Sequence, residues 1–203
     1  MAKYTAATSF CSQKTLCNID SCEMCYHRSF ASHEKSKFWS KDNNITPRQV
    51  CKGTEKKYKF NCEKCNHEFL KMLFDVTGKG KESWCPYCAN QRLCDDSNCK
   101  ICYNKSFASH EKSNYWSKNN NLMPRQVFKG TQKRYKFNCE KCNHEFLGII
   151  LSITKENQWC PFCANRQLCF SEECKLCFNK SFASHPRSKY ICDRNPVNRR
   201  LFF

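Results

Sequence analysis

Residues 60–69 read FNCEKCNHEF, and residues 137–146 repeat the same ten letters. A second cysteine pair follows each copy, in WCPYC at residues 84–88 and in WCPFC at residues 159–163. A C-x-x-C turn presents two thiolates to one metal ion, and two such pairs a hairpin apart supply the four ligands of a tetrahedral zinc site. The spacing predicts two four-cysteine zinc sites: Cys62, Cys65, Cys85 and Cys88, and then Cys139, Cys142, Cys160 and Cys163.

A second cysteine pattern, C-x4-C-x2-C, occurs three times. Its cysteines are Cys17, Cys22 and Cys25, then Cys94, Cys99 and Cys102, then Cys169, Cys174 and Cys177. Three thiolates leave one zinc ligand to be found. The histidines at the same offset in all three copies are His33, His110 and His185, and we expect them to complete these sites. Alternatively, these histidines cap or pack, and the fourth ligand comes from elsewhere. We expect His67 and His144, which directly follow the first knuckle, to orient or pack under a site.

Metal binding fits this cysteine usage better than disulfide bonding. The chain has 20 cysteines in 203 residues, a density that also suits a small secreted disulfide scaffold. Its first fifteen residues, however, contain no apolar segment of the kind a signal peptide needs. We therefore expect about five zinc ions per chain, in a reducing, intracellular compartment, with disulfides and iron–sulfur clusters as the alternatives. Cys11, Cys51 and Cys192 are left over; Cys51 aligns with Phe128, which favours an apolar role.

The repetition extends beyond the cysteines. SFASH at residues 29–33 recurs at 106–110 and 181–185, and PRQV at residues 47–50 recurs at 124–127. Such self-similarity indicates tandem duplication of one folding unit. The expected organisation is an N-terminal tail over residues 1–16, one zinc-binding repeat over 17–93, a second over 94–168, and a truncated third copy with a C-terminal tail over 169–203.

Only short elements are expected within a repeat. Aromatic residues alternate with lysine over residues 58–60 and 135–137, as in a strand leading into the first knuckle. Residues 68–76 and 145–153 are expected to form the first arm of a hairpin, whose return arm in the first repeat passes through Trp84. The predicted fold class is small, metal-stabilised α+β or irregular, with tandem treble-clef-like zinc-ribbon modules built from short β-hairpins and short helices.

The run from Trp39 to Cys88 resembles the probable zinc-ribbon, treble-clef-like repeat family, whose members occur in tandem in bacterial and large DNA virus proteins. CPYC at residues 85–88 matches the family pattern, NHEF at 66–69 stands where GHEW is usual, and Phe60 replaces the tryptophan of the approach strand. The added C-x4-C-x2-C element resembles a variant of viral members. The resemblance implies zinc binding and a small ribbon fold. If the chain is viral, it also implies a place in the virus factory or the virion interior.

The charge of the chain favours an anionic partner. Lys+Arg 35 against Asp+Glu 18 give a formal net charge of +17, which zinc-bound thiolates would lower to about +10. We expect sequence-independent nucleic-acid binding, with lysines on phosphates and any exposed ring of the ribbon strands on an unpaired base. The expected contacts are Lys52, Lys56, Lys57 and Lys59, and Lys129, Lys133, Arg134 and Lys136. The alternative is that the rings are core residues of the ribbon and the lysines form a solvated strand face.

Two other function classes compete with nucleic-acid binding. The alternative is a zinc-stapled scaffold that bridges other proteins, such as a minor capsid or virion component of a large DNA virus. Catalysis is not expected, because the sequence has no nuclease-like carboxylate pair and no Ser-His-Asp arrangement, and zinc sites with four protein ligands are closed. No stretch approaches the ~20 apolar residues that cross a bilayer, and neither a membrane nor a small-molecule substrate is expected as a partner.

Overall fold

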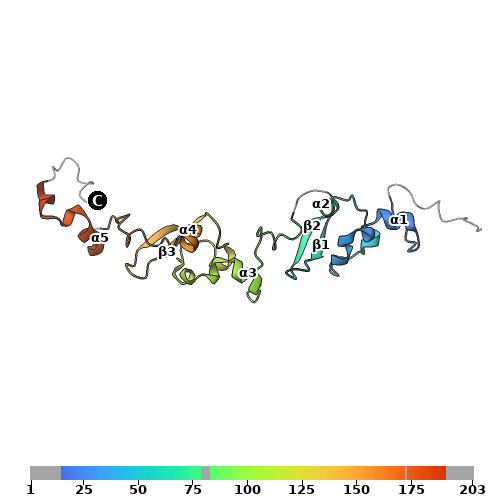
Figure 1. Ribbon diagram of the computed structural model, residues 1–203, viewed down its shortest axis with the longest axis horizontal. Coiled ribbons are helices and arrows are strands. Elements are labelled where there is room, and N and C mark those ends of the chain that lie inside the picture. Colours follow the sequence, from blue (N-terminus) through green and yellow to red (C-terminus); the bar gives the residue numbers. More distant parts are fainter. Residues whose placement is uncertain (1–14, 79–82, 172, 191–203) are drawn as a thin grey trace, which may run out of the picture. The chain divides into compact units, whose positions relative to one another are not determined.

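The computed structural model describes residues 15–78, 83–171 and 173–190 (Figure 1). The chain divides into two compact units, Met1–Arg92 (unit 1) and Leu93–Phe203 (unit 2). The third C-x4-C-x2-C copy therefore groups with the second repeat. Every helix in the described ranges is too short or too polar to cross a bilayer.

Each unit is built on one antiparallel hairpin. In unit 1, β1 (Lys57–Asn61) pairs with β2 (Glu68–Met72), and in unit 2, β3 (Arg134–Asn138) pairs with β4 (Glu145–Ile149). The first C-x-x-C knuckle is the turn of this hairpin, since the Cys62 N–H donates to the His67 carbonyl at 3.0 Å. Asn66 lies in the left-handed region with φ 56°, a conformation that asparagine tolerates better than most residues.

The prediction that residues 68–76 and 145–153 form the first arm of a hairpin is wrong. These residues supply the second strand of the hairpin and then a short helix, α2 (Leu73–Thr77) or α4 (Ile150–Lys155). The reason is burial at helical spacing: Leu73 and Val76 are buried three residues apart, as are Ile150 and Ile153. Trp84 belongs to no strand of the described residues.

The C-x4-C-x2-C segments each end in a short helix: α1 (Glu23–Arg28), α3 (Lys100–Lys105) and α5 (Lys175–Lys180). Single 3-10 turns follow, in unit 1 η1 (Phe30–Ser32), η2 (Glu34–Phe38) and η3 (Pro47–Gln49). Unit 2 has η4 (Phe107–Ser109), η5 (Glu111–Tyr115) and η6 (Pro124–Gln126), and after α5 also η7 (Phe182–Ser184) and η8 (Pro186–Tyr190).

An aromatic cluster forms the core of each unit. Phe137 on β3 is fully buried, and its ring lies 5.6 Å from Phe107, 5.4 Å from Trp116 and 5.4 Å from Trp159 between centroids. These partners come from η4, from the segment before β3, and from the second cysteine pair. Phe60 has the same contacts in unit 1. In each repeat, one ring thus connects the segment before the hairpin, the hairpin itself and the second cysteine pair.

Truncation of that ring tests the core. We expect Phe137→Ala to destabilise the zinc-loaded protein by about 3–5 kcal/mol, because a buried aromatic ring is lost and a cavity remains. Leu147→Ala, on the facing strand but exposed, is the control and should change stability by no more than about 0.5 kcal/mol. Chemical denaturation followed by tryptophan fluorescence measures both, and equal losses would contradict this account of the core.

Candidate metal centres

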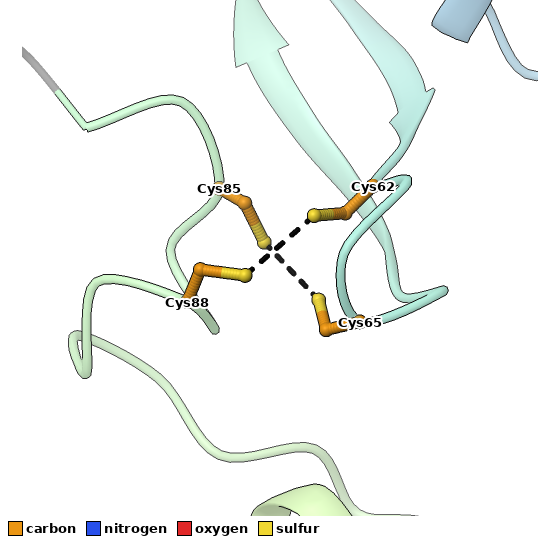
Figure 2. A group of neighbouring side chains, drawn as sticks. All are labelled: Cys62, Cys65, Cys85 and Cys88. Carbon is orange, nitrogen blue, oxygen red and sulfur yellow. Dashed lines mark hydrogen bonds between the residues drawn. The ribbon is translucent and has the colours of Figure 1, made fainter.

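The four cysteines of the ribbon in unit 1 converge (Figure 2). The Sγ atoms of Cys62 and Cys88 lie 3.6 Å apart, as do those of Cys65 and Cys85. A regular tetrahedron with Zn–S bonds of about 2.3 Å has S···S edges of about 3.8 Å, so these thiols fit one zinc ion. The first pair comes from the β1–β2 turn, and the second from a tight turn in which the Ala89 N–H donates to the Cys85 carbonyl.

The ribbon of unit 2 has the same geometry and shows the electrostatics of such a site. Its diagonal Sγ pairs, Cys139–Cys163 and Cys142–Cys160, are 3.6 and 3.5 Å apart. Burial acts to raise the pKa of Cys139, but the N–H groups of Lys141 and Cys142 and the neighbouring thiols lower it to about 7. Burial, and then the adjacent sulfurs, raise the pKa of Cys163 to about 11. Four thiols so close together cannot all ionise without a cation, which is the charge that zinc supplies.

A histidine completes the last C-x4-C-x2-C set. His144 Nε2 lies 3.4 Å from Cys174 Sγ and 3.5 Å from Cys177 Sγ, and the ligand atoms of His144, Cys169, Cys174 and Cys177 all lie within 4.8 Å of one another. A tetrahedral zinc ion bound by sulfur and nitrogen has S···N edges of about 3.6 Å, so this group fits a three-cysteine, one-histidine site. The ring of His144 is held by stacking on Phe162 at 4.2 Å.

The prediction that the SFASH histidines bind metal is corrected by this geometry. Within the described residues, His33, His110 and His185 join none of the cysteine groups. Each accepts a hydrogen bond at Nδ1 from the N–H two residues later, at 3.2, 3.2 and 3.1 Å, and stacks on the phenylalanine of its own motif. Burial lowers the pKa of His33 and His110, which keeps Nδ1 an acceptor. They are therefore capping residues, whereas His144, expected only to orient or pack, joins a cysteine group of unit 2.

The other two sets share the scaffold of the last one. The Sγ atoms of Cys94, Cys99 and Cys102 lie within 4.8 Å of one another, and so do those of Cys17, Cys22 and Cys25. In all three sets the first cysteine N–H donates to the third cysteine Sγ, at 3.3 to 3.4 Å. In the sequence, His67 precedes Cys94, Cys99 and Cys102 as His144 precedes the last set.

Two arginines that the sequence analysis did not single out support these sets. Arg48 Nη2 lies 3.9 Å from Cys17 Sγ and donates to the Ile19 carbonyl at 2.8 Å. Arg125 Nη2 lies 3.6 Å from Cys94 Sγ and donates to the Asp96 carbonyl at 2.9 Å. Each guanidinium fixes the loop after the first cysteine and offsets thiolate charge. Both arginines lie in the repeated PRQV motif, and this repetition is the sequence signal that could have indicated them.

The remaining cysteines take no part in these groups within the described residues. Cys51 is half-buried and forms an isolated bridge with Ser29, the position that Phe128 takes beside Ser106. Cys11 and Cys192 lie outside the described residues.

The predicted nucleic-acid contacts separate into paired and exposed residues. Lys59 pairs with Glu68 at 3.1 Å, and Lys136 pairs with Glu145 at 3.7 Å. Lys52 is half-buried, whereas five of the eight residues are exposed: Lys56, Lys57, Lys129, Lys133 and Arg134. The strand rings turn inward: Phe60 and Phe137 are fully buried, and Tyr58 and Tyr135 pack on Trp39 and Trp116 at 4.7 and 4.8 Å. The alternative reading of these rings, as ribbon core, is therefore the correct one.

The histidine assignment can be tested by counting metal. The five cysteine groups predict about five zinc ions per chain. We expect His144→Ala to leave one zinc ion with three protein ligands. A colorimetric chelator should therefore remove one equivalent of zinc per chain much faster than it does from the unchanged protein. His110→Ala is the matched control and should release zinc as the unchanged protein does. The opposite pattern would restore the SFASH histidines as ligands.

Comparison with known proteins agrees with these metal centres. The chain is 36% identical over 200 residues to "Uncharacterized protein R635" of Acanthamoeba polyphaga mimivirus, an alignment that covers 96% of this chain and 48% of that protein. The chain thus spans about half the length of this relative. The model of a family described as "Probable Treble clef zinc finger domain" matches residues 36–91 and 113–166, which contain both four-cysteine groups. This chain therefore belongs to the probable treble-clef zinc finger domain family, with two domains in tandem.

Proposed function

We propose that this protein is a non-enzymatic zinc-repeat protein that binds nucleic-acid backbones without sequence preference. The observation that carries the proposal is a hollow beside the hairpin of unit 2, which we name the arginine hollow. It has a volume of about 230 Å³ and is lined by Arg134, Arg166, Gln158 and Trp159, and by residues of β4 and α4. Its lining includes no carboxylate.

The chemistry of the arginine hollow suits phosphate. Arg134 begins β3 and Arg166 follows the second knuckle, so two exposed guanidinium groups from distant parts of the sequence face one concave surface. A guanidinium group offers paired N–H donors in a plane that matches two phosphate oxygens. Gln158 adds an uncharged amide. This combination suits the phosphodiester groups of a nucleic-acid backbone.

The corresponding hollow in unit 1 is less positive. It has a volume of about 350 Å³ and is lined by Lys57, Lys71, Asp75 and Gln91, among others. Gln91 stands where unit 2 has Arg166, and Asp75 adds a carboxylate. Lys71 Nζ already donates to the Ser83 carbonyl at 3.0 Å. We therefore expect unit 2 to contribute more of the affinity, with unit 1 adding avidity.

Sequence-independent binding follows from the short elements. The longest helices in the described ranges have six residues, too few to lay a recognition helix along a major groove. Phosphate contacts fix position on nucleic acid but do not identify bases. A binding role also fits zinc sites with four protein ligands, because these leave no position for a catalytic water.

Charge reversal at the arginine hollow tests the proposal. Fluorescence anisotropy would measure binding of the zinc-loaded protein to single-stranded DNA, duplex DNA and RNA across a salt series. We expect the double variant Arg134→Glu, Arg166→Glu to bind roughly tenfold more weakly than the unchanged protein and to lower the salt slope by about two, because two phosphate contacts are lost. Equal weakening of all sequences is expected.

The control is a double variant with the same charge change elsewhere in unit 2. Lys100→Glu, Lys118→Glu alters two exposed residues that do not line the hollow. This variant should retain most of the affinity. If both double variants weaken binding equally, net charge and not the hollow is responsible. If the unchanged protein does not bind at physiological salt, the nucleic-acid proposal fails.

A scaffold role is the second candidate, and a repeated apolar surface favours it. The residues on either side of the buried helical cysteine are exposed in all three copies: Met24 and Tyr26, Ile101 and Tyr103, Leu176 and Phe178. An apolar position that stays exposed in each copy suits protein docking. Co-purification with protein partners, in place of nucleic acid, would favour this role.

A further inference from the structure

The arginine hollow has more apolar surface than a phosphate group needs. Leu147, which is 58% exposed, lines it together with Ile149, Ile153, Trp159 and Pro161. A phosphate is bound by cations and N–H donors, whereas a nucleotide also carries a base whose two faces are apolar. The hollow therefore offers one surface for the charge of a nucleotide and another for its base.

The two guanidinium groups of the hollow are not engaged by carboxylates. Arg134 and Arg166 are exposed, and neither takes part in an ion pair within the part of the chain that the structure describes. The carboxylate of Glu156, close in the sequence to the lining, accepts a hydrogen bond from Gln158 Nε2 at 3.0 Å. Both arginines can therefore bind the phosphates on either side of one nucleotide.

One difference between the repeats opens the apolar side of the hollow in unit 2. Gly148 stands where unit 1 has Lys71, whose Nζ reaches the Ser83 carbonyl at 3.0 Å. Among the described residues, Trp84 is not part of the lining in unit 1, whereas the equivalent Trp159 is part of the lining in unit 2. The missing side chain at position 148 thus leaves the tryptophan accessible from the hollow.

The neighbours of Gly148 are adapted to the missing side chain. A Cβ atom at this position would lie 2.8 Å from Ile153 Cδ1 and 3.3 Å from the Phe137 ring. Unit 1 has Val76 in place of Ile153, and valine has no Cδ1 atom. Glycine with isoleucine in unit 2 therefore replaces lysine with valine in unit 1.

We propose that the arginine hollow accepts one unpaired nucleotide of a nucleic-acid strand, with its base on the apolar lining and its flanking phosphates on Arg134 and Arg166. This inference rests on the proposed function and adds the class of nucleic acid. Single strands are preferred to duplexes, because the bases of a duplex are already paired and stacked. Apolar contact with the face of a base does not distinguish one base from another, so binding stays independent of sequence.

A strand without bases tests this inference. Fluorescence anisotropy would compare the zinc-loaded full chain on oligothymidine, on a strand of abasic sites of the same length, and on duplex DNA. The two single strands carry the same charge, so phosphate contacts alone predict equal affinity for them. We expect oligothymidine to bind about tenfold more tightly than the abasic strand, and more tightly than the duplex.

The outcomes separate this inference from the proposed function. Equal affinity for the two single strands, or duplex binding as tight as that of oligothymidine, would overturn the inference and leave backbone binding intact. Displacement of oligothymidine by an equal concentration of thymidine monophosphate would make a free nucleotide the ligand and also overturn it. If none of the three nucleic acids binds at physiological salt, the proposed function itself fails.

Truncation of the apolar lining locates the base. Leu147→Ala changes no charge, and we expect it to bind oligothymidine about threefold to tenfold more weakly and the abasic strand as before. Met123→Ala is the matched control, because Met123 is also an exposed apolar residue of unit 2 but does not line the hollow. It should bind both strands like the unchanged protein. If both variants behave alike, the base does not lie in the hollow.

A repeat swap separates the shape of the hollow from its charge. The double variant Gly148→Lys, Ile153→Val has the residue pair of unit 1 and adds one positive charge. Net charge alone predicts tighter binding of both strands. We expect the new lysine instead to cover Trp159, so that oligothymidine loses its higher affinity over the abasic strand. Tighter binding of both strands with this difference retained would overturn the inference, and Leu147→Ala tests it independently if the swap does not fold.

Discussion

Zinc–thiolate coordination is the constraint on which the remaining structure depends. Each unit has a small core, centred on one buried phenylalanine, and its hairpin has five residues per strand. Domains of this size bury too little apolar surface to be stable on that account alone. The turn that closes the hairpin is also the first half of a metal site, and the tryptophan of the core directly precedes the second half. Metal binding and core packing therefore hold the same two segments together.

The thiol chemistry explains why the metal is needed for more than geometry. Four sulfur atoms within 4.8 Å of one another would otherwise hold protons in a crowded, partly buried space. The pKa of Cys139 is lowered and that of Cys163 is raised, the pattern expected where ionising one thiol makes ionising its neighbour harder. A divalent cation removes this conflict, which links folding of the ribbon to loading of the metal.

The sequence predicts part of this molecule well, for identifiable reasons. Two C-x-x-C pairs place four thiolates within a short stretch, so the four-cysteine groups follow from spacing alone. The histidine of the last set could not be found in the same way, because it comes from the preceding copy, 25 positions before Cys169. The histidine that lies at a constant offset within each copy is the capping residue of SFASH and not a ligand. The strand pairing was also missed, because the knuckle is itself the hairpin turn, and the apolar run after it continues from strand into helix.

His144 takes part in two metal sites through different atoms. Its carbonyl accepts the Cys139 N–H at 2.9 Å and so closes the knuckle of the four-cysteine site, while its ring faces the cysteines after α4. Loading of the four-cysteine site fixes the backbone that orients the His144 imidazole toward Cys174 and Cys177. The metal ion of the three-cysteine site then binds a ring that is already ordered. By linkage, the second metal ion must favour the first to the same degree. We therefore expect zinc uptake by this half of the chain to be cooperative, with few partly loaded states between the empty and the loaded form.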